Sequence, residues 1–204
     1  MKKTLCAVAL CALFSPAIAE EKILDPVLVT ATRYELSNLD IPSSVNKLDI
    51  PELGLKLTAA DTLVRVPGLA AVDTAGADLK ISNRGFGSRA SFGSRGVLIY
   101  KDGIPVSVPD GFGTTTLIDL NTIGSVEVLR GPFSILYGTS SNAVVNFITE
   151  EPTKPAEVSG SYVSGSFDTT QKNAKYSGIT GSVKYMINQT QTDTNGYRDF
   201  SKNS

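Results

Sequence analysis

The sequence predicts an α+β fold that is rich in short β-strands, with short helical segments and long glycine-rich loops. Apolar, β-branched runs at residues 126–129 and 144–148 are bounded by Gly, Pro, Ser and Asn, a pattern typical of two short strands joined by a compact turn region. Nearer the C-terminus, residues 178–188 alternate apolar and polar side chains, which indicates a longer strand. Strands are therefore expected to dominate the fold.

Residues 1–19 have the pattern of a secretory signal peptide. Two lysines precede an apolar run, and a small-residue cleavage site, Ala17-Ile18-Ala19, stands before Glu20. The apolar run is too short to span a bilayer, which needs about 20 residues. The lysines and the cleavage site disfavour a core helix. Cleavage would remove Cys6 and Cys11, so we expect the exported chain to have no thiol chemistry.

Composition excludes several classes of function. The formal net charge is −1, so no basic field points to a nucleic-acid partner. The chain contains no His, which removes the commonest metal ligand and general base. Asp102, Asp110 and Asp119 lie at predicted turns, where Asp hydrogen-bonds the local backbone. The sequence therefore predicts no enzyme active site, no metal site and no cofactor.

The first part of the exported chain predicts broken strands and one helix. Residues 41–57 contain strand-like pieces interrupted by two prolines and a glycine. A short helix is expected over residues 59–64, because Thr58 has the features of an N-cap with Asp61 three positions later. Pro67-Gly68 ends this helix.

Two further strands, at residues 80–83 and 97–100, bracket a loop rich in Gly, Ser and Arg. The run 85–90 fits the dinucleotide-binding spacing G-x-G-x-x-(G/A), but that motif needs a helix directly after the glycines. Here the chain runs into a strand, so a nucleotide site is disfavoured. Asp102-Gly103 predicts a hairpin turn, and residues 117–124 predict one short helical turn.

The order of motifs around residues 125–149 resembles the end of the plug domain of TonB-dependent outer-membrane receptors. In that family a strand ending in RGP leads into a YG segment and then a strand ending in N-x-x-T. The matching residues are Glu127-Val128, Arg130-Gly131-Pro132, Tyr137-Gly138 and Asn146 to Thr149. One departure follows Tyr137-Gly138, where the family usually has Gly-Gly-Val and this chain has Asn142-Ala143. We therefore expect backbone strain at the start of the second strand.

The resemblance implies a fold and a domain order. The plug would be a small mixed β-sheet with short helices and long loops, followed by the first strands of an incomplete outer-membrane β-barrel. The expected divisions are a signal peptide at 1–19, a TonB box and linker at 20–40, the plug at 41–152 and the start of the barrel at 153–204.

The alternation over 178–188 would make a barrel strand with its apolar face toward lipid. That face would comprise Ile179, Gly181, Val183, Tyr185 and Ile187. Two or three strands cannot close a barrel, so we expect the chain to be the first third or less of a full receptor.

A short β-prone run near the mature N-terminus resembles a TonB box. An extended segment with unpaired backbone groups can be captured as an added strand by a partner's sheet edge. The expected TonB-binding residues are Asp25, Pro26, Val27, Leu28, Val29 and Thr30. The alternative for such a run is an edge strand or a disordered arm.

Two loops, 85–96 and 109–115, resemble those that contact the ligand in this family. They offer cationic donors, hydroxyls and aromatic faces suited to a polyanionic, planar ligand. The candidate contacts are Ser88, Arg89, Ser91, Phe92, Arg95, Asp110 and Phe112. Alternatively, the arginines pair only with carboxylates of the barrel wall. Three other charges, Arg84, Glu127 and Arg130, match family positions where the plug locks against the barrel.

The resemblance therefore implies a monomeric receptor in the outer membrane that gates TonB-dependent uptake of a scarce ligand. Its partners would be TonB, with the inner-membrane energising complex, and a ferric siderophore. The loop sequences are most similar to a subgroup that includes receptors for pyrroloquinoline quinone, so a non-iron ligand stays open. A soluble periplasmic binding module and a non-functional product are the remaining alternatives.

Overall fold

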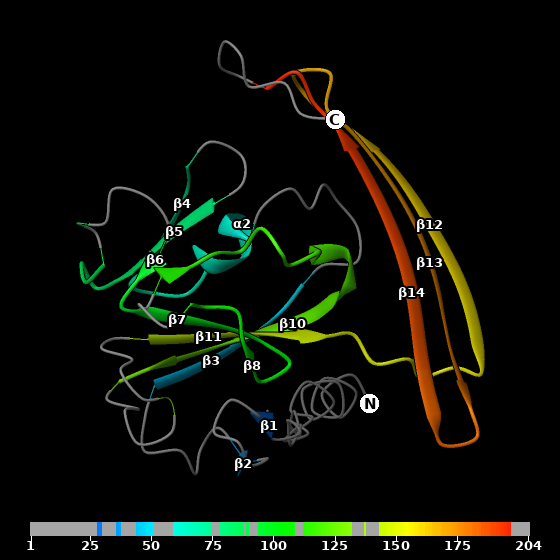
Figure 1. Cartoon of the computed structure of the whole chain (residues 1–204), viewed down its shortest axis with the longest axis horizontal. Helices are drawn as coiled ribbons and strands as arrows, with labels where there is room; N and C mark the ends of the chain where they lie inside the picture. The colour runs from blue at the N-terminus through cyan, green and yellow to red at the C-terminus, as the bar shows by residue number, and fades with distance from the viewer. Residues whose placement is uncertain are drawn as a thin grey trace, which may run out of the picture.

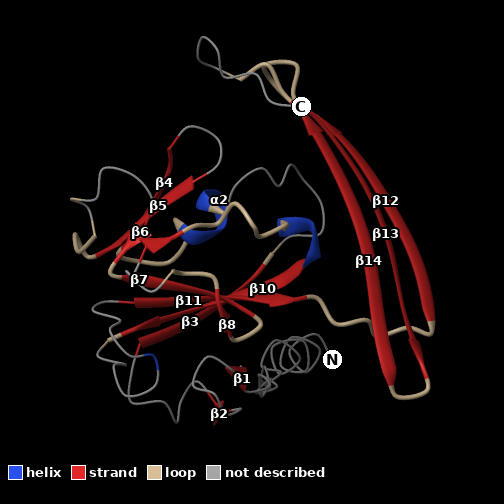
Figure 2. Ribbon diagram, in the orientation of Figure 1, coloured by secondary structure: helices blue, strands red, loops and turns tan. Residues whose placement is uncertain are grey.

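The computed structural model describes residues 28–29, 36–37, 44–50, 59–74, 78–87, 89, 94–108, 112–131, 137 and 143–196. Strands predominate in this part of the chain, and the helical segments are short (Figure 2). Two of them have described bounds, α2 (Ala60–Leu63) and the 3-10 turn η1 (Leu120–Thr122). Among the described residues, no helix has the length and apolarity needed to cross a membrane.

The strands, in chain order, are β1 (Leu28–Val29), β2 (Leu36–Ser37), β3 (Ser44–Asp49), β4 (Leu69–Thr74), β5 (Asp78–Asn83), β6 (Ser94–Arg95), β7 (Val97–Lys101), β8 (Ile104–Pro105), β9 (Phe112–Gly113), β10 (Ile123–Arg130), β11 (Ala143–Thr149), β12 (Ala156–Ser164), β13 (Thr170–Thr180) and β14 (Val183–Asp193).

A five-stranded mixed sheet, the central sheet, has the order β3-β10-β11-β7-β8. Its neighbours pair antiparallel except β11 and β7, which are parallel. The predicted strands at 126–129 and 144–148 form β10 and β11, and they pair with each other in register from Ser125↔Ile148 to Arg130↔Ala143. The mixed sheet expected from the sequence is thus confirmed.

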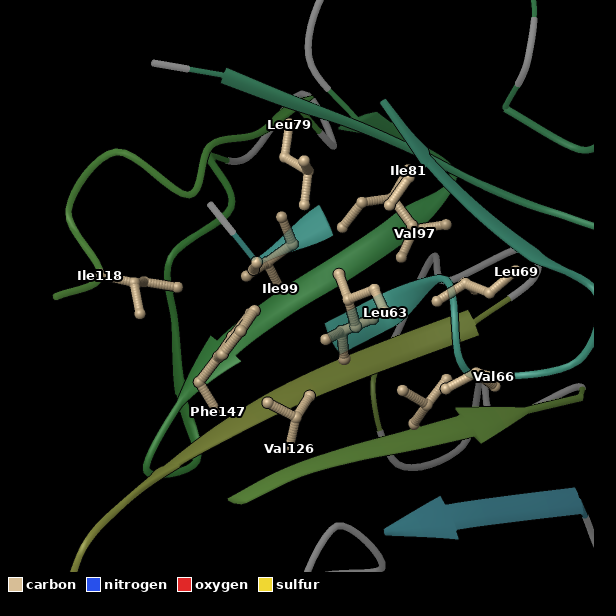
Figure 3. Packing of buried hydrophobic residues seen from close by; sticks show 14 of the residues in the cluster. Leu63, Val66, Leu69, Leu79, Ile81, Val97, Ile99, Ile118, Val126 and Phe147 are labelled. Carbon is tan, nitrogen blue, oxygen red and sulfur yellow. The ribbon is translucent and has the colours of Figure 1, made fainter. Parts of the chain in front are cut away.

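The main hydrophobic core lies between the central sheet and the segment that carries α2, β4 and β5 (Figure 3). Leu63 of α2 and Ile81 of β5 are fully buried, as are Val126 and Phe147 of the sheet. Their side chains point toward one another in Figure 3. Burying a side chain of this size contributes about 1.5–3 kcal/mol, so this contact holds the helix and the β4–β5 hairpin on the sheet.

The helix begins one residue later than predicted, at Ala60. Its N-cap is Ala59, which makes no side-chain capping hydrogen bond, and Thr58 lies outside the described residues. The first turn is satisfied by the backbone instead, since the N–H groups of Thr62 and Leu63 both donate to the Ala59 carbonyl. Burial of Leu63, rather than a capping box, therefore accounts for the helix.

The turn at Asp102-Gly103 joins β7 to β8, as the sequence predicts. Both residues have positive φ, 50° and 78°, which is the geometry of a type I′ hairpin turn. At the start of β11, Ala143 pairs with both Arg130 and Val97 and is not among the residues with positive φ. Ala143 therefore shows no strain of the expected kind, and Asn142 lies outside the described residues.

Strands β12, β13 and β14 form a separate antiparallel sheet, the C-terminal sheet. It stands beside the central sheet in Figure 1 and is built of longer strands. The prediction of a single strand over 178–188 is wrong, because the chain turns at Gly181-Ser182, where Gly181 has φ +61° and Thr180 pairs with Val183.

This two-residue turn also changes which side chains share a face, because paired residues lie on the same side of a sheet. Val183, Tyr185 and Ile187 do lie on one face of β14, as expected, but Ile179 pairs with Lys184 and lies on the other face. The alternation in the sequence passes through the turn without interruption, so it did not reveal the hairpin.

Candidate functional site

The predicted TonB box falls partly within the described residues. Leu28 and Val29 form β1, which pairs antiparallel with β2 in the register Leu28↔Ser37 and Val29↔Leu36. Asp25, Pro26, Val27 and Thr30 lie outside the described residues. In Figure 1 the β1–β2 pair lies at the same end of the molecule as the β13–β14 turn, whereas β4, β5 and β6 lie toward the opposite end.

The first candidate ligand loop begins in a tight turn after β5. The backbone groups of Asn83 and Phe86 exchange hydrogen bonds of 3.0 and 2.9 Å, with Arg84 at φ 48° and Gly85 at φ 85° between them. Gly87 follows with φ 86°, and a Cβ there would lie 2.7 Å from the Arg95 carbonyl oxygen. The two ends of the loop therefore meet at Gly87, where a side chain does not fit.

The far end of the same loop is fixed by Ser94, which is fully buried. Its hydroxyl accepts a hydrogen bond from the Ile81 N–H (2.9 Å) and donates one to the Leu79 carbonyl (2.7 Å). The Ser94 hydroxyl is thereby satisfied both as a donor and as an acceptor, and so are two backbone groups of β5. All of these groups are buried, where an unpaired polar group is costly. Ser94 thus attaches β6 to β5.

The two candidate ligand loops come together at β6 and β9. Ser94 pairs with Gly113, and Arg95 pairs with Phe112. The Arg95 side chain is exposed, the Phe112 side chain is half-buried, and Arg89 is exposed on the first loop. Two of the predicted contacts, Arg95 and Phe112, therefore lie at this junction, and Arg89 lies on the loop that leads to it. Ser88, Ser91, Phe92 and Asp110 lie outside the described residues.

Two of the predicted lock residues lie close together. An added Cβ on Gly68 would lie within 4 Å of the side chains of both Arg84 and Arg130. Partial burial, together with the positive charge of Arg84, lowers the pKa of Arg130 from its usual value. Two neighbouring guanidinium groups make this corner of the fold attractive to an anionic partner.

Arg130 also binds its own domain. Its Nη1 donates to the Pro67 carbonyl, and its Nη2 donates to the Ser44 hydroxyl (2.7 Å) and to the Asn46 side-chain oxygen. Through these bonds one guanidinium joins β3, β10 and the segment after α2. The third lock residue, Glu127, lies elsewhere: it is fully buried in the middle of β10, level with Lys47 and Asn146.

A set of contacts that the sequence did not predict joins the central-sheet domain to the C-terminal sheet. Asp119 Oδ2 accepts hydrogen bonds from Asn188 Nδ2 (2.7 Å) and Thr190 Oγ1 (3.1 Å). Lys175 Nζ forms an ion pair with Glu150 at 2.5 Å. The partners are about 25 to 71 residues apart in sequence, so no local pattern could have revealed them. Asp119 does bond its local backbone as predicted, but only with its other oxygen.

Comparisons with known proteins agree with this architecture. Residues 37–145 match the TonB-dependent Receptor Plug Domain family. The chain is 32% identical over 188 residues to the vitamin B12 transporter BtuB of Vibrio vulnificus, covering 87% of this chain and 29% of that protein. It is 36% identical over 165 residues to the pesticin receptor of Yersinia pestis, covering 74% of this chain and 23% of that protein.

The fold is also similar to solved receptor structures. The pyoverdine outer membrane receptor FpvA of Pseudomonas aeruginosa superposes with a TM-score of 0.66 at 25% identity, covering 85% of this chain and 26% of that chain. The chain thus spans less than a third of the length of these relatives. They are receptors and transporters rather than enzymes. With a family match over more than half of its residues, the chain belongs to the TonB-dependent receptor family and carries its plug domain.

Proposed function

We propose that the chain forms the plug and the first wall strands of an outer-membrane receptor for the TonB-dependent uptake of a ferric siderophore. The observation that carries the proposal is the junction at β6 and β9, where the two candidate ligand loops start from one base and Arg95 lies beside Phe112. A cation next to an aromatic ring suits a planar, anionic iron chelate. Relatives include a probable siderophore receptor of Acinetobacter baumannii, PirA.

The exposed face of the C-terminal sheet has the apolar residues expected of a surface that contacts the outer membrane. Val158, Val183 and Ile187 are exposed by 81%, 62% and 68%, and all three lie on the face that points away from the central sheet. Tyr176 and Tyr185 pack on the same face with ring centroids 5.5 Å apart, near the short turn at Gly181. Outward apolar bands, aromatic residues near the interface and short periplasmic turns are typical of outer-membrane strands.

The positions of β1 and of the first candidate ligand loop, toward opposite ends of the molecule, support coupling to TonB from the periplasmic side. β1 lies at the same end as the β13–β14 turn, and the first candidate ligand loop runs between β5 and β6, which lie toward the other end (Figure 1). We therefore assign Asp25 to Thr30 as the TonB-binding segment, with Leu28 and Val29 offering a strand for addition to a partner's sheet. Arg84 and Arg130 are proposed to bind carboxylates of the barrel wall, and buried Glu127 is proposed to support them from within β10.

Uptake of radioactive iron in cells tests the proposal. Cells that express the receptor take up ⁵⁵Fe from a panel of ferric siderophores, with haemin, vitamin B12 and pyrroloquinoline quinone as competing ligands. We expect uptake from at least one ferric siderophore, lost when TonB is deleted. Arg95→Gln should reduce it about tenfold, since a hydrogen bond to a charged group contributes about 1.5–3 kcal/mol.

Arg65→Gln is the matched control, because Arg65 is also an exposed arginine but follows α2, away from the β6–β9 junction. It should leave uptake unchanged. Uptake of haemin, vitamin B12 or pyrroloquinoline quinone, without any ferric siderophore, would contradict the siderophore assignment while keeping the receptor function. Uptake that persists without TonB would contradict the receptor function itself.

A further inference from the structure

The carboxylate of Asp119 serves two parts of the molecule with its two oxygens. Oδ1 accepts hydrogen bonds from the backbone N–H of Asn121 (2.9 Å) and from its side-chain amide (3.2 Å), which caps η1. Oδ2 accepts from Asn188 and Thr190 of β14. One oxygen is therefore used within the plug, and the other reaches the C-terminal sheet.

The donors on β14 are also held in position by a residue of the neighbouring strand, β13. Asn173 of β13 donates to the side-chain oxygen of Asn188 (2.7 Å) and to the Thr190 hydroxyl oxygen (2.9 Å). These side chains are half-buried and cross from one strand to the next. Because the Asn188 oxygen is already occupied by Asn173, its amide nitrogen is turned toward Asp119. The arrangement is specific for an acceptor at position 119.

A second contact also joins an acid of the plug to a donor of the C-terminal sheet. Glu150, directly after β11, forms an ion pair with Lys175 of β13, whose side chain is only 17% exposed. The Glu150 backbone N–H donates to the Thr122 carbonyl (2.9 Å), so this acid is attached to the same η1 turn as Asp119. Glu151 is paired with Lys184 of β14. In all three contacts the acid comes from the plug side and the donor comes from the C-terminal sheet.

Apolar packing does not make this junction. Both clusters of buried hydrophobic residues draw their members from residues 45–147, and within the described residues no side chain of β12, β13 or β14 belongs to either cluster. The most exposed apolar residues of these strands, Val158, Val183 and Ile187, face outward instead. Hydrogen bonds and ion pairs therefore account for the described contact, and such groups can separate into water without exposing apolar surface.

We infer that Asp119 and Glu150 form a docking surface on the plug, and that its partner is the β13–β14 hairpin of the same chain. The folded plug thereby sets the position of the first wall strands through polar recognition. This inference does not depend on which ligand is carried or on TonB.

Exchanging the two partners across the contact tests the inference. Asp119→Asn keeps an oxygen to cap η1 but puts an amide nitrogen in place of Oδ2, the oxygen that accepts from Asn188 and Thr190. Adding Asn188→Asp reverses the donor and the acceptor, so the amide at 119 can donate to the carboxylate at 188 with the composition unchanged. Asp168→Asn is the matched control, because Asp168 also accepts from an Asn amide, that of Asn195 (2.8 Å), but within the C-terminal sheet and its turns.

Amide hydrogen exchange of the detergent-purified protein, followed by mass spectrometry, is the measurement. We expect Asp119→Asn to raise exchange about tenfold in peptides covering residues 183–193, as loss of hydrogen bonds to a charged group predicts. The exchanged pair should return it to within about twofold of the original, and Asp168→Asn should leave these peptides unchanged. Peptides from β10 and β11 report whether the plug itself is folded.

Two results would overturn the inference. Exchange over 183–193 that does not respond to Asp119→Asn would show that the contact does not hold the hairpin. A rise that the exchanged pair fails to reverse, or that extends equally into β10 and β11, would show that Asp119 acts only inside the plug as a cap.

Discussion

The carboxylate of Asp102 accepts hydrogen bonds from both the backbone N–H and the hydroxyl of Thr149, at 2.7 and 2.6 Å. Asp102 lies in the β7–β8 turn, and Thr149 ends β11. The next residue, Gly103, donates its N–H to the Asn146 side chain (3.2 Å). This turn therefore does more than reverse the chain, because it closes the end of the parallel β11–β7 pair.

Two substitutions at Asp102 distinguish the contribution of its side-chain hydrogen bonds from that of its backbone conformation. Asp102→Ala removes both acceptors and places Ala at φ 50°, so we expect a loss of about 1–2 kcal/mol in the free energy of unfolding. Asp102→Asn keeps one acceptor and tolerates this φ, and it should lose about half as much. Urea unfolding followed by far-UV circular dichroism measures both. Equal stability of Asp102→Ala and the original would contradict the role of this turn.

Gly87 and Gly85 form a matched pair for testing the base of the first candidate ligand loop. Their φ angles are 86° and 85°, but an added Cβ would meet the Arg95 carbonyl only at Gly87 and nothing within 4 Å at Gly85. Both Ala substitutions carry a backbone strain of about 1–3 kcal/mol, and only Gly87→Ala adds the steric clash. We expect Gly87→Ala to reduce ⁵⁵Fe-siderophore uptake at least fivefold more than Gly85→Ala. Equal uptake by the two variants would show that the approach of Arg95 to Gly87 does not matter for binding.

Ser94 is expected to be important for stability although its side chain is small. Ser94→Ala leaves the Ile81 N–H and the Leu79 carbonyl unpaired in a buried place, which costs about 1–3 kcal/mol. For a chain of this size each kcal/mol lowers Tm by about 2–4 °C, so differential scanning calorimetry should detect the change. Ser82→Ala, half-buried on β5, is the control and should shift Tm by no more than about 1 °C. A Tm unaffected by Ser94→Ala would contradict the attachment of β6 to β5.

Arg130 is expected to hold the edge strand β3. Arg130→Lys keeps the charge but cannot reproduce bonds from two guanidinium nitrogens to Pro67, Ser44 and Asn46. Hydrogen exchange in β3 should therefore rise about tenfold, while β11, in the middle of the sheet, should keep its protection. Arg65→Lys, at an exposed site after α2, should change neither strand. An unchanged β3 in Arg130→Lys would show that strand pairing alone holds it.

The strands of the central sheet were predictable because their signals are local. β10, β11 and β7 are runs of β-branched residues between turn formers, and Asp102-Gly103 marks a hairpin by its own backbone preference. The parallel pairing of β11 with β7 could not be predicted in this way. The strands are far apart in the chain, and nothing in either run specifies the other as its neighbour.

One wrong prediction, and two features that the sequence did not reveal, have equally physical causes. The alternation over 178–188 passes through the turn at Gly181, so periodicity predicted one strand where the structure has two. The family pattern groups three lock residues whose role stays a prediction, and it could not reveal that Glu127 is buried inside the domain while Arg84 and Arg130 lie side by side at Gly68. Asp119 has the local role that its turn position predicts, but its additional contact with Asn188 depends on the tertiary fold.

The measurement that tests the central claim most directly is separation of inner and outer membranes from cells that make the protein, with immunodetection of residues 41–152. The account predicts that the plug is found in the outer-membrane fraction and resists extraction by salt and carbonate, because we propose that the exposed face with Val158, Val183 and Ile187 contacts lipid. A plug found in the soluble periplasmic fraction would contradict the account and would favour a free binding module.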